Sequence, residues 1–128
     1  MTSYNIFIHM KLYKIIYSDK NPDSLLLVCD DLRFAESFLD RLFGLIFKNL
    51  KKGYGFAMMD CNSIHSFWMR YKIDVVFLDK NNEIIKLYES FKQFRMTPLI
   101  KGACCVIEFP ECTIRDFSLK TGDRLKFV

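Results

Sequence analysis

The residues of this chain that could carry chemistry are concentrated in one stretch, residues 61–79. It holds Cys61, His65 and Asp74 together with Trp68, the only tryptophan of the chain. Thiol, imidazole and carboxylate groups can act as nucleophile, base and orienting acid, while aromatic side chains supply apolar contact area. Such a mixture can build a functional site. Alternatively, its polar side chains can be buried and hydrogen-bonded, so that they serve only to hold the fold together. The stretch therefore supports three functional hypotheses and one structural interpretation.

Two of the hypotheses give Cys61 a chemical role. In a small hydrolase or transferase, Cys61 would be the nucleophile, His65 its base and Asp74 the group that orients the imidazole. In an extended strand Cys61 and His65 would stand about 13 Å apart, so a turn would have to bring them together. In a metal or redox sensor, Cys61 would converge with Cys104 and Cys112. The chain has no standard zinc spacing, and we predict no metal and no cofactor.

The third hypothesis, which we favour, is a cleft for a small ligand or a protein segment. Trp68 and Phe67 would supply the apolar surface, whereas His65, Arg70 and Asp74 would orient a polar group. The predicted binding residues are His65, Phe67, Trp68, Met69, Arg70 and Asp74.

The structural interpretation concerns the same carboxylate. Asp74 begins a strongly apolar strand candidate, where burial of an unpartnered charge would cost several kcal/mol. Arg41, on a predicted helix, is the expected partner. In this interpretation His65 lies at the edge of the core, and Trp68 and Met69 belong to the core itself.

The composition predicts a single globular domain. Of the 128 residues, 51% are hydrophobic and 16% are aromatic. A chain of this length and composition can bury a stable core without disulfide bonds or a structural metal ion. We assign the domain to residues 11–128 and treat residues 1–10 as a leader or extension. The net charge of +4 is mild, and the nearest approach to a basic cluster is Lys48, Lys51 and Lys52 after the predicted helix, which argues against a nucleic-acid partner.

The number of cysteines and the hydropathy of the chain indicate the cellular compartment of the protein. The five cysteines are an odd number without a Cys-x-x-Cys pair, so we expect reduced thiols in a reducing environment. No segment is long enough for a membrane-spanning helix, and the first ten residues lack the pattern of a signal peptide. We therefore predict a cytoplasmic protein.

The hydrophobic pattern predicts short strands around one helix. Asp30 and Asp31 are good helix N-caps, and apolar residues follow them at helical spacing as far as Ile46. The expected strands are 11–17, 25–29, 55–59, 67–70, 73–78, 84–88, 103–109 and 124–128. They follow one another through short turns, so we expect mostly antiparallel pairing. The fold class is mainly β (α+β): a small antiparallel β-barrel or sandwich of about seven or eight strands with one helix packed against it.

Several motifs together resemble a widespread prokaryotic family, the domain-of-unknown-function family number one hundred ninety-two. The resemblance rests on the segments 41–46, 55–56, 63–69 and 73–79, followed by Pro98, Val106-Ile107-Glu108 and Gly122-Asp123. It covers roughly residues 31–128 with order and spacing kept. The chain departs from the family pattern in two places, with Ile46 in place of methionine and with Glu111-Cys112 in place of a small residue and glycine.

The resemblance implies a compact, mostly β domain and no known reaction. It maps the recurring family residues onto Arg41, His65, Trp68, Met69, Asp74 and Asp123, which would mark either a site or the polar joints of the fold. We therefore expect a non-enzymatic ligand- or peptide-binding module whose oligomeric state the sequence does not define. The alternative is a small hydrolase or transferase that uses Cys61 and His65, or a metal or redox sensor.

Overall fold

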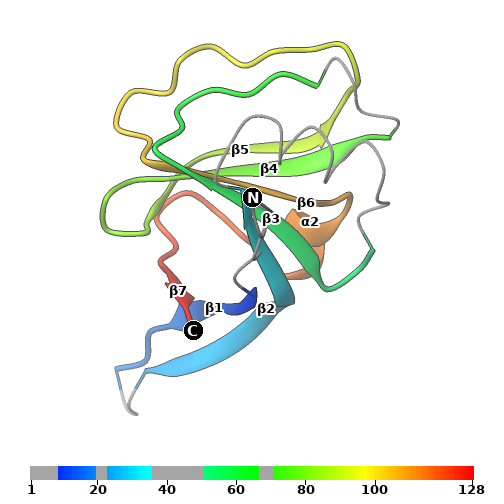
Figure 1. Ribbon diagram of the computed structural model, residues 1–128. Helices are drawn as coiled ribbons and strands as arrows, with labels where there is room; N and C mark the ends of the chain where they lie inside the picture. Colours follow the sequence, from blue (N-terminus) through cyan, green and yellow to red (C-terminus); the bar gives the residue numbers. More distant parts are fainter. Residues whose placement is uncertain (1–8, 20–22, 36–50, 67–70) are drawn as a thin grey trace, which may run out of the picture.

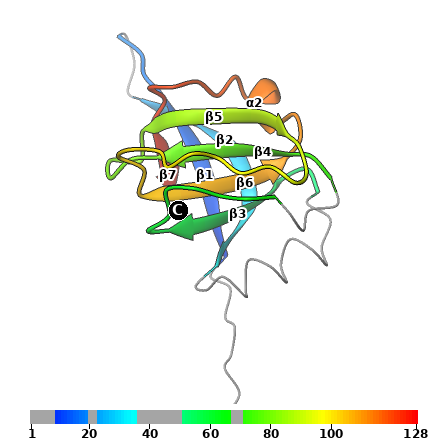
Figure 2. The same ribbon diagram turned by 90° about the horizontal axis from the view of Figure 1, so that it is seen from above.

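The computed structural model describes residues 9–19, 23–35, 51–66 and 71–128. These residues form a seven-stranded sheet and a one-turn helix (Figures 1 and 2). The elements are β1 (His9–Ile16), β2 (Ser24–Ala35), β3 (Tyr54–Met59), β4 (Ile73–Leu78), β5 (Ile84–Phe91), β6 (Cys105–Pro110), α2 (Thr113–Asp116) and β7 (Leu125–Phe127). The strand order is β5-β4-β6-β3-β2-β1-β7. The β2–β3 pair is parallel and the other pairs are antiparallel.

The sheet does not close into a barrel, although its two edges approach each other. Only an isolated bridge between Glu83 and Arg124 and neighbouring backbone hydrogen bonds connect the start of β5 with the segment before β7. One of these bonds joins the Ile84 N–H to the Asp123 carbonyl at 2.8 Å. The predicted class, a mainly β fold of sandwich type with a helix, is confirmed.

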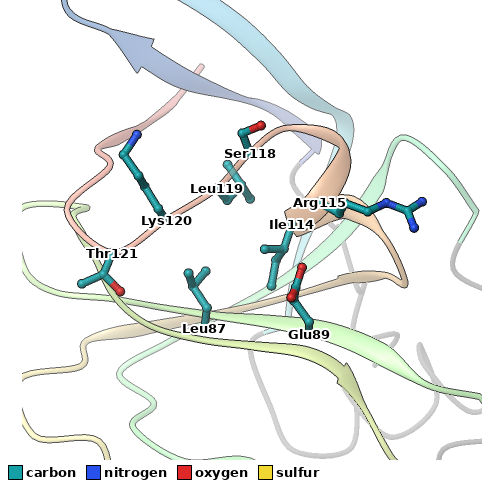
Figure 3. A pocket seen from close by; sticks show the side chains of 8 residues that line it. All are labelled: Leu87, Glu89, Ile114, Arg115, Ser118, Leu119, Lys120 and Thr121. Atoms are coloured by element: carbon teal, nitrogen blue, oxygen red, sulfur yellow. The ribbon is translucent and has the colours of Figure 1, made fainter.

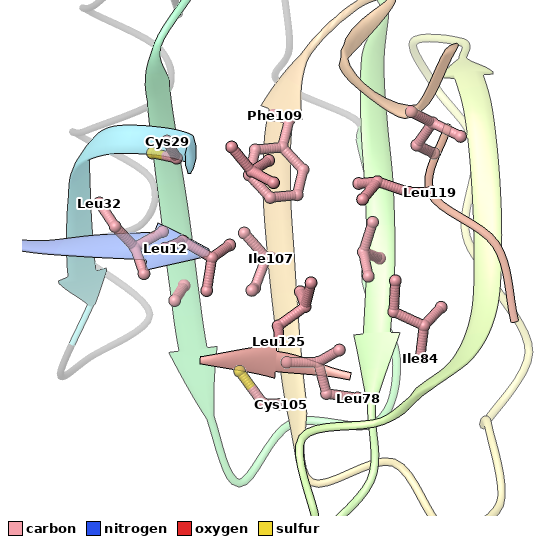
Figure 4. Close-up of a cluster of buried hydrophobic side chains, with 14 residues drawn as sticks. Leu12, Cys29, Leu32, Leu78, Ile84, Cys105, Ile107, Phe109, Leu119 and Leu125 are labelled. Atoms are coloured by element: carbon pink, nitrogen blue, oxygen red, sulfur yellow. The ribbon is translucent and has the colours of Figure 1, made fainter. Parts of the chain in front are cut away.

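Strand β4 is buried along its whole length, as its apolar sequence predicts. Successive side chains of a strand point to opposite faces, so β4 contributes to two cores. The helix-side core holds Val76 and Leu78, and α2 and β7 add Ile114 and Leu125 to it (Figure 4). The loop-side core, on the other face, holds Ile73, Val75, Phe77, Val106 and Ile64.

Most predicted strands coincide with observed ones, but the predicted start of the helix is wrong. Residues 31–35 continue β2 and pair with β3, so Asp30 and Asp31 do not cap a helix. Leu32 is buried, whereas Asp31 and Arg33 share the opposite face and lie 3.4 Å apart. Alternation along a strand places residues i and i+2 together, which explains this ion pair. The remainder of the predicted helix, residues 36–46, lies outside the described residues.

The first strand begins earlier than the predicted domain boundary. His9 and Met10 pair with Arg33 and Leu32 as part of β1. Residues 1–8 lie outside the described ranges, so the assignment of a leader stays a prediction. Within the described ranges no helix has the length and apolar character needed to cross a bilayer.

Candidate functional site

Asp74 is a buried carboxylate that joins three elements of the fold. Only 1% of its surface is exposed. Its Oδ1 atom accepts a hydrogen bond from the Ser90 N–H in β5 at 3.0 Å, and its Oδ2 atom accepts one from the Ile114 N–H in α2 at 2.8 Å. Hydrogen bonds of this kind offset the cost of burying the charge. Asp74 thus fixes the end of β5 and the first turn of α2 relative to β4.

The structure does not bring Asp74 and His65 into one cleft. Asp74 lies on the face of β4 that carries Val76 and Leu78, whereas the segment of His65 packs through Ile64 into the loop-side core. The alternation of side chains along β4 therefore separates the two groups by the thickness of the sheet. The predicted cleft as a whole stays a prediction, because its residues 67–70 lie outside the described ranges.

His65 lies on an irregular ladder above the loop-side core. It forms an isolated bridge with Met96, and the backbone of residues 62–66 is hydrogen-bonded to residues 94–100. Buried Thr97 stabilises the ladder because its Oγ1 atom accepts the Ile64 N–H at 3.1 Å. The apolar side chains of Phe94, Met96 and Leu99 in this ladder are exposed.

Five of the residues singled out in the sequence lie outside the described ranges. They are Arg41, Phe67, Trp68, Met69 and Arg70. The aromatic part of the predicted cleft and the predicted Arg41–Asp74 ion pair therefore stay predictions.

The cysteines do not converge as the sensor hypothesis requires. Cys61 and Cys104 lie near Cys105, whereas Cys112 precedes α2 beyond the other end of β6, roughly 20 Å away along the strand. The Cys61 thiol donates to the Ser63 carbonyl at 3.1 Å. Burial raises the pKa of Cys105 to about 12, and neighbouring thiols add to the effect. Among the described residues, no group of three metal-ligating side chains is present.

An open groove lies between β5 and the segment that follows α2 (Figure 3). It has a volume of about 660 Å³. Figure 3 shows Leu87, Ile114 and Leu119 on its floor, while Arg115 and Lys120 extend outward from its rim. Glu89 on β5, Ser118 and Thr121 complete the lining. Sequence reasoning missed this groove because β5 and residues 114–121 meet only through the tertiary fold.

The wall of this groove is held by a buried ion pair. The Lys14 Nζ atom of β1 lies 3.1 Å from Asp123 Oδ2 and donates a hydrogen bond to the Ser118 carbonyl at 2.9 Å. Burial acts to raise the pKa of Asp123. The N–H of Lys120 and the ammonium groups of Lys14 and Lys120 outweigh burial and hold that pKa below its ordinary value. The Gly122-Asp123 motif is therefore more than a turn, since it ties the groove segment to β1.

The family resemblance is confirmed by comparison with known proteins. The model of DUF192, described as an uncharacterised family, matches residues 21–127. A UPF0127 protein of Pyrococcus furiosus is 32% identical over 101 residues, which cover 76% of this chain and 86% of that protein. A UPF0127 protein of Pyrococcus horikoshii is 31% identical over 101 residues, covering 76% of this chain and 87% of the relative.

Two solved structures share the fold at low sequence identity. A Novosphingobium aromaticivorans protein of unknown function superposes with a TM-score of 0.73 at 11% identity, covering 98% of this chain and 90% of its own. A Sinorhizobium meliloti protein described as a candidate transcription regulator gives 0.70 at 14% identity, with coverages of 96% and 97%. At such identities the likeness shows the fold alone.

Proposed function

The chain belongs to the DUF192 family, and from that premise we propose that it is a non-enzymatic binding module. Its ligand is a small amphipathic anion held in the groove between β5 and residues 114–121. The observation that carries this proposal is the groove itself, whose volume of about 660 Å³ lies in the range of small-molecule sites. A family without an assigned reaction is compatible with a binding role.

The floor of the groove suits the apolar part of such a ligand. Ile114 and Leu119 are buried side chains of the helix-side core, and Leu87 packs against that core from β5. An alkyl group placed on this floor would extend an existing apolar cluster. Burial of each methylene would contribute about 0.8 kcal/mol.

The rim of the groove suits the anionic part. Arg115 and Lys120 are exposed, and their ion pairs with Asp116 and Asp123 are at 3.4 and 3.3 Å. Exposed pairs of this kind are weak, so the cations remain able to engage a carboxylate or phosphate. Glu89 stands on the opposite wall and would repel an anion, which orients the ligand toward residues 115–120.

The buried Lys14–Asp123 pair supports the proposal because it preorganises the groove segment. Lys14 anchors the carbonyl of Ser118 and the carboxylate of Asp123, which flank Leu119 and Lys120. A wall that is already in place does not have to be ordered when the ligand binds, and this lowers the entropic cost of association.

Hexanoate is a suitable probe, with neutral hexanamide as its matched control. We expect hexanoate to shift the backbone resonances of residues 87–89 and 114–121 with a dissociation constant near the millimolar range, because the probe has few atoms. Hexanamide should bind more weakly. The Arg115→Glu variant should weaken hexanoate binding, whereas Lys101→Glu, an exposed lysine outside the groove, should leave it unchanged. Equal affinity for the acid and the amide in all variants would contradict the proposal.

The aromatic stretch provides a second candidate surface. Exposed Phe94, Met96 and Leu99 lie on the ladder of His65, and the predicted binding residues 67–70 begin two positions after His65 in the sequence. Trp68 is the only tryptophan of the chain, so its fluorescence reports on the predicted binding residues 67–70. Binding in the groove should leave Trp68 emission unchanged. A fluorescence change with unmoved groove resonances would assign the ligand to the aromatic stretch instead.

A further inference from the structure

The hairpin of β1 and β2 projects from the body of the protein (Figures 1 and 2). Its strand β2 carries three adjacent exposed leucines. Leu25, Leu26 and Leu27 are 45%, 40% and 40% exposed. Strands normally alternate between a buried and a solvent-facing side. Three consecutive half-exposed leucines therefore mean that both faces of β2 are incompletely covered here.

The outer edge of β2 is also open along this stretch. Strand β3 pairs with β2 only from Asp31 to Ala35, and no other described strand lies against residues 24–28. An uncovered strand edge presents unpaired N–H and C=O groups and acts as a template for another strand.

The hydrogen bonds of β1 identify which backbone groups face outward. The N–H of Ile15 donates to Arg124 beside β7, so the groups of Lys14 and Ile16 point the other way, to β2. Lys14 is opposite Leu26, and the Leu26 backbone therefore points inward to β1. The N–H and C=O groups of Leu25 and Leu27 consequently point outward.

We propose that two copies of this chain pair antiparallel through this edge. A twofold axis at Leu26 places Leu25 of each copy opposite Leu27 of the other. Both outward-facing residues of each copy then exchange their N–H and C=O groups, and Leu26 faces its own equivalent at the centre. The contact is isologous and closes as a dimer rather than a fibre.

The strip is self-complementary and uncharged, which favours a second copy as its occupant. Residues 24–29 carry no charge, so two copies that pair through them bring no like charges together at the contact, although the chain as a whole carries a net charge of +4. A register centred on Leu27 would place Asp23 opposite Asp31, and one centred on Leu25 would place Asp23 opposite Leu27. The register centred on Leu26 instead places Asp23 opposite Cys29.

The size of the contact predicts a weak dimer. A single pair of edge strands with three half-exposed leucines per copy is smaller than a standard stable interface. Sedimentation velocity over a wide range of protein concentration should show a reversible monomer–dimer equilibrium. Amide exchange at Leu25 and Leu27 should slow as the dimer forms, whereas the Leu26 amide, bonded to β1, should be protected in both states.

A charge-swap experiment tests the register. The double variant Leu25→Lys/Leu27→Lys should associate at least about tenfold more weakly than the wild type, because it puts like charges opposite each other. Leu25→Glu/Leu27→Glu should behave in the same way, and an equimolar mixture of the two variants should restore the dimer. Leu99→Lys, which changes an exposed leucine on the ladder of His65 rather than on β2, is the matched control and should dimerise normally.

Three outcomes would overturn the proposal. They are a wild-type chain that stays monomeric at every concentration, a dimer that survives in the lysine variant, and lysine and glutamate variants that fold but do not associate when mixed. Circular dichroism of each variant separates loss of pairing from loss of the fold. A monomeric wild type would leave the edge to a strand of a different protein.

Discussion

The Lys14 ammonium lies 3.1 Å from the Asp123 carboxylate, and both side chains are about nine-tenths buried. The pair joins the first strand to the turn that precedes the last one, where β1 and β7 also pair through their backbones. It sits behind the groove proposed as the binding site. The pair therefore couples the stability of the fold to the position of the groove segment.

Removal of one partner of this pair should be costly. Lys14→Met should lower the free energy of unfolding by about 3 kcal/mol, because it leaves a buried carboxylate with only the exposed Lys120 as a cationic partner. The double variant Lys14→Met/Asp123→Asn should lose less than the sum of the two single variants, which a double-mutant cycle from urea unfolding would measure. Additive losses would contradict the coupling.

The same carboxylate predicts a pH dependence of stability. The pKa of Asp123 is lower in the folded state, so its contribution is present above its unfolded pKa of about 3.9. This contribution is lost as the pH falls through the lower folded value. Asp123→Asn should therefore flatten the acid limb of the stability curve below about pH 5. Chemical unfolding at a series of pH values would measure this, and parallel acid limbs in both proteins would refute it.

Two aspartates provide a matched test of buried hydrogen bonding. Asp74 accepts N–H groups at both oxygens, so Asp74→Asn must face one N–H donor with an amide NH₂ and should cost about 2–3 kcal/mol. Asp79 accepts two N–H groups at Oδ1 alone, so Asp79→Asn can keep both bonds and should cost less than about 1 kcal/mol. Thermal melts of both variants would decide, and equal losses would contradict this account of Asp74.

Gly55 should not tolerate a side chain. A Cβ atom there would lie 2.9 Å from Leu32 Cδ1, 3.1 Å from Cys29 Sγ and 3.2 Å from Phe109 Cε1. Gly55→Ala should therefore destabilise by about 1–3 kcal/mol through overpacking. Adding Leu32→Val removes the nearest contact atom, so the double variant should lose less than the two single losses combined. Denaturant midpoints with unchanged slopes are the measurement.

The five free cysteines should divide into two reactivity classes. Cys29 and Cys105 are buried, and burial raises the pKa of each to about 12, so they remain protonated thiols at neutral pH. Iodoacetamide should label Cys61, Cys104 and Cys112 first in the folded protein and all five only after unfolding. Peptide mass spectrometry over time would show the order, and early labelling of Cys105 would contradict it.

The local hydrophobic pattern of the sequence predicted most of the strands correctly, but it predicted the candidate functional sites poorly. The apolar run of β4 predicted a central buried strand because complete burial leaves no alternation. Residues 31–35 misled because their apolar positions fit a helix as well as a strand, and pairing with β3, a tertiary effect, decided between them. The Gly122-Asp123 motif was singled out in the sequence, but the partner of Asp123, Lys14, was not, because no local spacing connects them.

The candidate site shows the same division. The mixed stretch was predicted to border one hollow, and the burial of Asp74 was foreseen as the structural interpretation. The sheet separates Asp74 from His65, because which face a residue takes depends on strand register rather than on residue type. The groove lined by Leu87 and Leu119 could not be foreseen, since its walls come from segments joined only by folding.

The pairing of β1 with β7 has a consequence for synthesis. Lys14 reaches the carbonyl of Ser118, a residue 104 positions later, and the ladder with Leu125 to Phe127 lies further still. Contacts between residues so distant in sequence slow folding, because the entropic cost of closing a long loop comes before the contacts stabilise the chain. On the ribosome the β1 edge of the leucine-bearing hairpin would thus stay uncovered until β7, near the end of the described chain, had emerged. Shielding by a chaperone would matter most during that interval.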